Sequence, residues 1–181
     1  MKYAHYDKET GKLLGYYDDA IHQTIPEPNI KLTEDKWQES ISSNYNYIDT
    51  KSKTLSYKDF RTEEEKLNDA KKNKINYLKQ SFLETLKKGY ATSISENRFY
   101  SEERDISKLK NAYDLAIAAG ADVMKVKTLD GRIELSVNDV KQALLELGEY
   151  YQSQLQKLWD LEEQVSNATN IEEVEAIKWE D

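Results

Sequence analysis

Residues 136–168 read SVNDVKQALLELGEYYQSQLQKLWDLEEQVSNA, with one glycine and no proline. When Val137 is taken as position a of a heptad, nine of the ten a and d side chains are apolar or aromatic. The a and d positions, here called the seam, are Val137, Val140, Leu144, Leu147, Tyr151, Gln154, Leu158, Leu161, Val165 and Ala168. This period predicts one helix over about 137–168, roughly 48 Å long at 1.5 Å per residue. Such a helix must cover its seam with other helices.

Two arrangements can cover this seam. In the first, the helix packs within the chain against a second amphipathic helix, which carries Leu67 to Leu86 on its apolar side. In the second, copies of the chain form a coiled coil and the protein is a homo-oligomer. Tyr151 at an a position and Gln154 at a d position fit a tight two-stranded coiled coil poorly. The pattern therefore favours the intramolecular bundle.

The composition is that of a polar but folded protein of one or two domains. Of the 181 residues, 33% are charged and 38% apolar, and the net charge is -8. An acidic balance argues against binding to nucleic acid. No run approaches 18 apolar residues and the N-terminus has no apolar signal segment, so neither a membrane span nor secretion is expected. Cysteine is absent, which excludes disulfides and fits a cytosolic origin.

The first part of the chain, residues 1–60, predicts a tyrosine-rich α+β module. Its expected elements are strands at 2–6 and 12–17, a proline-containing loop at 18–29, a helix at 34–43, and a second hairpin of strands 45–49 and 54–58. Gly11 suits the first turn, and Thr33 is a good N-cap for the helix. Trp37 and Ile41 are expected to be buried by that helix.

The second part, residues 61–181, predicts a mainly helical domain with two β-hairpins and the long helix. The capping box of Thr62 and Glu65 opens a helix that extends to Lys88. The other expected elements are a hairpin of 91–95 and 98–100 turning at 96–97, a helix at 106–119, a hairpin of 123–129 and 132–135 with a type I′ turn at 130–131, and a last short helix opened by a capping box at 169–172. Trp179 is expected to dock at the end of that helix. The fold class is therefore α+β.

Few residue patterns in this sequence indicate catalysis or metal binding. Asp18, Asp19 and His22 lie together, but their spacing matches no familiar metal-ligand set. Acidic pairs such as Glu162 and Glu163 diverge on a helix, whereas catalytic carboxylates must converge. The chain has no nucleophile-elbow, phosphate-loop or zinc-protease motif. The sequence therefore predicts a protein without catalysis, cofactor or metal.

Aromatic residues in the first module suggest a binding surface. Strand alternation places Tyr3 with His5 on one face and Ala4 with Tyr6 on the other, so both sheet faces carry aromatic rings. Tyrosine is enriched at interfaces because it offers large contact area at low entropic cost. The predicted contact residues are Tyr3, Tyr6, Tyr16, Tyr17, Trp37, Tyr45 and Tyr47. The alternative is that these rings fill the core of a small module.

The order of these segments resembles phage tail-fibre assembly proteins. Residues 1–22 (MKYAHYDKETGKLLGYYDDAIH), 25–39 (IPEPNIKLTEDKWQE) and 47–57 (YIDTKSKTLSY) are similar to the N-terminal part of that family. The remainder resembles an uncharacterised helical domain common beside phage tail-fibre genes, through 89–93 (GYATS), 105–116 (DISKLKNAYDLA) and 169–179 (TNIEEVEAIKW).

The resemblance implies a function in bacteriophage or prophage tails. The expected role is that of a chaperone that binds the C-terminal end of the tail-fibre protein during trimer assembly, in the bacterial host cytoplasm, and that can remain on the virion tail. An alternative is a structural tail-fibre or baseplate component that oligomerises through the long helix. A third is a hydrolase of surface glycans that acts through unrecognised carboxylates. No nucleic-acid or membrane partner is expected.

Overall fold

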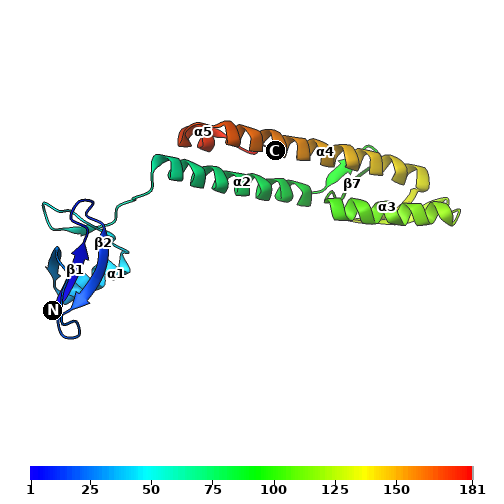
Figure 1. Ribbon diagram of the computed structural model, residues 1–181. Helices are drawn as coiled ribbons and strands as arrows, with labels where there is room; N and C mark the ends of the chain where they lie inside the picture. The colour runs from blue at the N-terminus through cyan, green and yellow to red at the C-terminus, as the bar shows by residue number, and fades with distance from the viewer. Residues whose placement is uncertain (181) are drawn as a thin grey trace. The chain divides into compact units, whose positions relative to one another are not determined.

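The computed structural model describes residues 1–180 and has an α+β fold (Figure 1). The chain divides into two compact units, unit 1 (Met1–Arg61) and unit 2 (Thr62–Asp181). Unit 1 has one buried cluster of side chains and unit 2 has two, and each unit is described by itself.

Unit 1 is built on a three-stranded antiparallel sheet. Strand β1 (Lys2–Tyr6) lies in the middle, between β2 (Leu13–Asp18) and β3 (Asn29–Leu32). The hairpin of β1 and β2 confirms the sequence prediction. The sequence did not predict β3, because its partner β1 lies far away in the chain and no turn signal joins the two strands.

Helix α1 (Glu34–Ser42) packs against one face of this sheet. Thr33 caps it by accepting a hydrogen bond from the Lys36 backbone N–H at 3.3 Å, as predicted. The helix buries Ser40 and half-buries Trp37, whereas Ile41 is 48% exposed, so the prediction for Ile41 is wrong. The reason is that the chain after α1 folds back onto Ser40, whose carbonyl accepts a hydrogen bond from the Tyr45 backbone N–H.

A short hairpin of β4 (Tyr47–Ile48) and β5 (Leu55–Ser56) completes unit 1. It joins the first hairpin at Gly11, whose carbonyl accepts a hydrogen bond from Ile48 N–H at 2.8 Å. Gly11 has a φ of +73°, and a Cβ there would lie 2.5 Å from the Ile48 oxygen, so only glycine fits. The core beneath the sheet consists of Ala4, Tyr6, Leu32 and Ile48.

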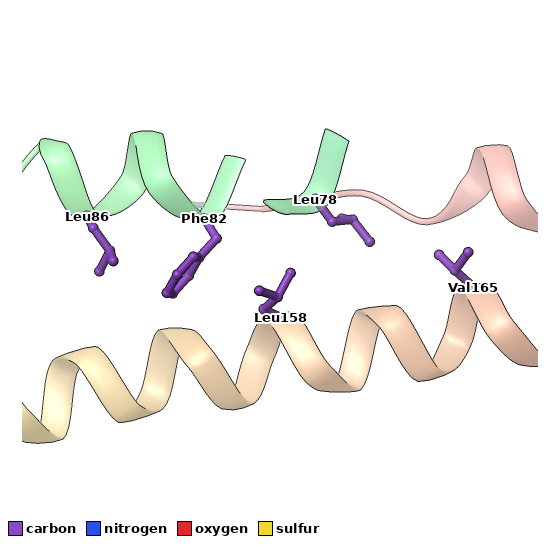
Figure 2. Close-up of a cluster of buried hydrophobic side chains, with 5 residues drawn as sticks. All are labelled: Leu78, Phe82, Leu86, Leu158 and Val165. Carbon is purple, nitrogen blue, oxygen red and sulfur yellow. The ribbon is translucent and has the colours of Figure 1, made fainter. Parts of the chain in front are cut away.

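Unit 2 is organised by two long helices that lie side by side and run in opposite directions (Figure 1). They are α2 (Glu63–Lys87), opened by the predicted capping box, and α4 (Val137–Asn167). Figure 2 shows the apolar side chains that meet between them: Leu78, Phe82 and Leu86 from α2, and Leu158 and Val165 from α4. Trp179, which follows the last short helix, packs against this cluster, and its Nε1 donates a hydrogen bond to Thr85 Oγ1 at 2.9 Å.

The first half of α4 packs against a second group of elements. These are β6 (Tyr90–Thr92), β7 (Ser95–Phe99), α3 (Glu103–Ala118), β8 (Val123–Thr128) and β9 (Gly131–Ser136). Phe99, Val126, Val140, Ala143 and Leu147 form the buried centre of this group. One helix thus serves two hydrophobic cores, which explains why its apolar seam is so long.

None of the ten seam side chains is exposed. Tyr151, an unusual residue for a coiled-coil seam, instead packs edge-on against Phe82, with ring centroids 6.1 Å apart. The seam is therefore covered within one chain, as the intramolecular alternative predicts. Self-association through these residues would require unit 2 to open.

Three local predictions are wrong by one to three residues. The hairpin of β6 and β7 turns at 93–94 rather than 96–97, because the Glu146 carboxylate accepts hydrogen bonds from the backbone and hydroxyl of Ser93. The next turn lies at 129–130, where φ is negative, and only Gly131 has positive φ, so it is not type I′. The N-cap of α5 (Ile171–Ala176) is Asn170 rather than Thr169.

Candidate docking surface

The seven aromatic residues predicted as a contact surface do not lie on one face of unit 1. Tyr6 is buried with 3% exposure, and Tyr16 and Trp37 pack against the same core. The Lys2 ammonium lies over the Trp37 ring, 4.4 Å from its centroid. These three rings fill the space between the sheet and α1, as the core-filling alternative predicts, and they cannot form an outer contact surface.

Tyr3 and Tyr17 lie on the opposite face of the sheet. They are direct cross-strand partners on β1 and β2, and both are half-buried. The Tyr17 ring extends over Gly15, where a Cβ would lie 3.5 Å from a ring carbon. It makes edge contacts with His5 and His22 at centroid distances of 6.1 and 5.2 Å. We call Tyr3, His5, Tyr17 and His22 the outer sheet face.

The outer sheet face borders exposed apolar residues that the sequence did not single out. Leu14 is 57% exposed at a bulge in β2, where the register with β1 shifts. Ile21, next to His22, is 77% exposed. In addition, β2 is an edge strand of its sheet, and its first residue, Leu13, donates a backbone hydrogen bond outside the sheet, to the Asn46 carbonyl oxygen at 2.8 Å. An exposed strand edge beside aromatic rings is a surface on which another polypeptide can pair.

Tyr45 and Tyr47 lie away from the outer sheet face, and both are half-buried. The Tyr45 hydroxyl donates a hydrogen bond to Glu39 Oε1 at 3.2 Å, at the end of α1. Tyr47 contacts Phe60 at a centroid distance of 6.1 Å, with the Lys58 ammonium over its ring. Of the seven predicted contact residues, the structure thus brings only Tyr3 and Tyr17 together on an uncovered sheet face.

An ion pair fixes the open end of the hairpin. The Lys2 ammonium donates a hydrogen bond to Asp18 Oδ2 at 2.6 Å, across the register of β1 and β2. This contact and a hydrogen bond from the Ala20 backbone N–H hold the pKa of Asp18 well below its usual range. The N-terminal amino group pairs with Asp19, which raises the pKa of that amino group. The rings of the outer sheet face therefore project from a sheet whose open end is held by ion pairs.

The histidine and acidic residues of this region serve local structure. His5 Nδ1 lies 2.9 Å from the Pro28 carbonyl oxygen, and His22 Nδ1 lies 3.0 Å from the Asp18 carbonyl oxygen. Among residues 1–180, no group of three histidine, aspartate or glutamate side chains is placed to hold a metal ion. In the same residues, no helix combines the length and the apolar character needed to cross a membrane.

Comparisons with protein-family models, with curated proteins and with solved structures found no match for this chain.

Strand alternation in the sequence correctly separates Tyr3 and His5 from Ala4 and Tyr6. It does not reveal which face the module covers, because that depends on where α1 packs. The sequence also gave no signal for Leu14, since a bulge inverts the alternation at that position.

Proposed function

We propose that this chain is a non-catalytic tail accessory protein of a bacteriophage or prophage. It binds the C-terminal end of a tail-fibre polypeptide during trimer assembly in the host cytoplasm, and the outer sheet face of unit 1 is the contact surface. The resemblance of residues 1–22, 25–39 and 47–57 to tail-fibre assembly proteins supports the partner. One observation supports this choice of surface above the others: Tyr3 and Tyr17 are cross-strand partners on a sheet face that α1 leaves uncovered.

The chemistry of this surface suits a chaperone. A fibre chain that has not yet formed its trimer exposes strand edges and apolar side chains, which aggregate readily. The outer sheet face offers flat aromatic rings, and Leu14 and Ile21 add exposed aliphatic contacts at the open edge of β2. Tyrosine side chains lose little entropy on binding and often supply most of the binding energy.

The structural-component alternative needs a surface other than the seam. The seam residues of α4 are covered by α2, α3 and the hairpins of unit 2. Sedimentation of the purified protein tests this alternative directly. A stable oligomer that dissociates when the exposed residues of α4 are replaced by charged ones would support it, and a strict monomer would count against it.

Co-expression tests the proposed function. The proposed partner, a tail-fibre polypeptide, is produced alone, with the wild-type chain, and with the variant Tyr3→Ala/Tyr17→Ala. Soluble fibre trimer is measured by sedimentation. We expect trimer yield to rise with the wild-type chain and to fall back with the variant. Tyr57→Ala is the matched control, because Tyr57 is a 63% exposed tyrosine of the same unit outside the outer sheet face. Equal yield without the protein contradicts the proposal.

A further inference from the structure

Unit 2 carries a groove of about 390 Å³ between α3 and β8. Its lining is apolar at the base, where Phe99 is 1% exposed and Leu109 and Met124 are half-buried. Its rim carries the exposed Lys108, Lys125 and Lys127 together with the half-buried Asp105. The rim is therefore locally positive, although the net charge of the chain is -8.

Part of the rim lies on the hairpin of β8 and β9, where like charges face each other. Lys127 stands directly opposite Arg132 in the register of β8 and β9, and like charges in that position destabilise an antiparallel pair. Lys125 stands opposite Glu134, and Lys108 pairs with Asp105 at 2.8 Å. The rim and its neighbours thus place four cations against two carboxylates.

Within residues 1–180, no ion pair joins Lys125, Lys127 or Arg132 to a carboxylate. The Lys127 ammonium instead lies 5.8 Å from the centroid of the Tyr100 ring, which also lines the groove. An anion placed beside Lys125 and Lys127 would therefore relieve repulsion without breaking an existing pair.

The backbone beside the groove is also available for pairing. β8 belongs to a two-stranded sheet, in which it pairs only with β9. Four successive residues of β8, 124–127, line the groove. Just past the end of β8, the Leu129 backbone N–H donates a hydrogen bond to the Arg98 carbonyl oxygen of β7 at 2.8 Å. An extended polypeptide can add to an exposed strand edge, with main-chain hydrogen bonds for affinity and side-chain pockets for specificity.

We infer that this groove binds an extended acidic segment of a partner polypeptide. Its carboxylates pair with Lys125 and Lys127, and an apolar side chain between them contacts Leu109 and Met124. The apolar base favours a peptide over an inorganic anion, which has no apolar group to place there. The overall negative charge of the chain disfavours a long polyanion such as nucleic acid. This site is separate from the outer sheet face and does not depend on the function proposed for it.

Fluorescence anisotropy of the full chain tests the inference. The probe is a fluorescein-labelled short peptide in which glutamate alternates with leucine and phenylalanine. We expect Lys125→Glu/Lys127→Glu to raise the Kd at least about thirtyfold, since each lost charge-assisted contact weakens binding several-fold. The matched control is Lys8→Glu/Lys72→Glu, which makes the same charge change at two lysines that are exposed elsewhere. It should change the Kd by less than about threefold, the part due to net charge alone.

Three results would overturn the inference. The first is a wild-type chain that does not bind the peptide. The second is a groove variant that binds as tightly as the control. The third is an equal Kd for a single-stranded oligonucleotide of matched charge, which would indicate a general polyanion site. Tyr3→Ala/Tyr17→Ala should leave peptide binding unchanged, so that failure of this inference and failure of the tail-fibre proposal can be distinguished.

Discussion

The Lys53 ammonium donates a hydrogen bond to the Tyr6 hydroxyl at 2.5 Å, whereas the hydroxyl of Tyr16, which packs against the same core, is buried without a partner. The two inward tyrosines of unit 1 therefore contribute oppositely to stability. A buried polar group without a hydrogen bond costs about 1–3 kcal/mol, while one that is bonded to a charged donor stabilises by a similar amount.

Removal of each hydroxyl should shift stability in opposite directions. We expect Tyr16→Phe to raise the free energy of unfolding of unit 1 by about 1 kcal/mol and Tyr6→Phe to lower it by about 1–2 kcal/mol. Urea titration followed through the amide NMR signals of β1 reports on unit 1 alone. Two variants that shift in the same direction would contradict this assignment of the hydroxyls.

The contact between α2 and α4 should depend strongly on Phe82. This side chain is 8% exposed and contacts the rings of both Tyr151 and Trp179. Phe82→Ala should lower the stability of unit 2 by about 3–5 kcal/mol, because it leaves a cavity in the core. Leu83→Ala is the matched control, since Leu83 is the neighbouring residue and is 49% exposed, and should cost about 1 kcal/mol or less. Similar losses from both variants, measured by urea denaturation, would be evidence against this packing.

The positive charge of Lys127 should reduce the stability of unit 2. Replacing it with glutamate removes the repulsion with Arg132 and creates an attractive cross-strand pair. We expect Lys127→Glu to stabilise unit 2 by about 0.5–1 kcal/mol and to raise its Tm by up to about 4 °C. Circular dichroism at 222 nm follows this unit, which contains four of the five helices in residues 1–180. Lys72→Glu makes the same charge change on α2, and an equal rise there would show that net charge is the cause.

Unit 1 should lose stability in acid through Asp18. Its pKa is lowered in the folded state by the hydrogen bond from Lys2, so the ionised form is favoured by folding. The resulting stability is fully present above the unfolded pKa of about 3.9 and is lost as pH falls below that value toward the folded pKa. Asp18→Asn should therefore reduce the pH dependence of unit 1 stability below about pH 4. Asp7 and Asp49 also have lowered pKa values, through hydrogen bonds in their turns, so some acid sensitivity should remain.

Periodic and local signals predicted much of this fold. The seam predicted α4 to within a residue at each end, and Thr62 with Glu65 predicted the start of α2. Both signals are local, because a helix forms its hydrogen bonds within itself. Strand β3 could not be predicted in this way, since only its pairing with β1 makes it a strand. The turn at 93–94 was missed for a related reason, because it is fixed by Glu146 on a distant helix.

The candidate docking surface could be predicted only in part from the sequence. Alternation along β1 showed that both faces carry aromatic rings, but not which face α1 would cover. Once α1 covers Tyr6 and Tyr16 and packs its own Trp37 against the same core, only Tyr3 and Tyr17 remain on the outer side of the sheet. The cationic rim of the groove in unit 2 had no sequence signal at all, because Lys108 joins Lys125 and Lys127 only in three dimensions.

The most direct test of the proposed docking role is the affinity of the purified protein for the purified C-terminal end of the proposed tail-fibre partner, measured by calorimetry. Tyr3→Ala/Tyr17→Ala should raise the Kd at least about thirtyfold, which corresponds to about 2 kcal/mol, the threshold for residues that dominate an interface. Tyr57→Ala should leave the Kd within about threefold of the wild-type value. If the double variant binds as tightly as wild type, or if the wild-type chain does not bind the fibre, the outer sheet face is not the docking surface described here.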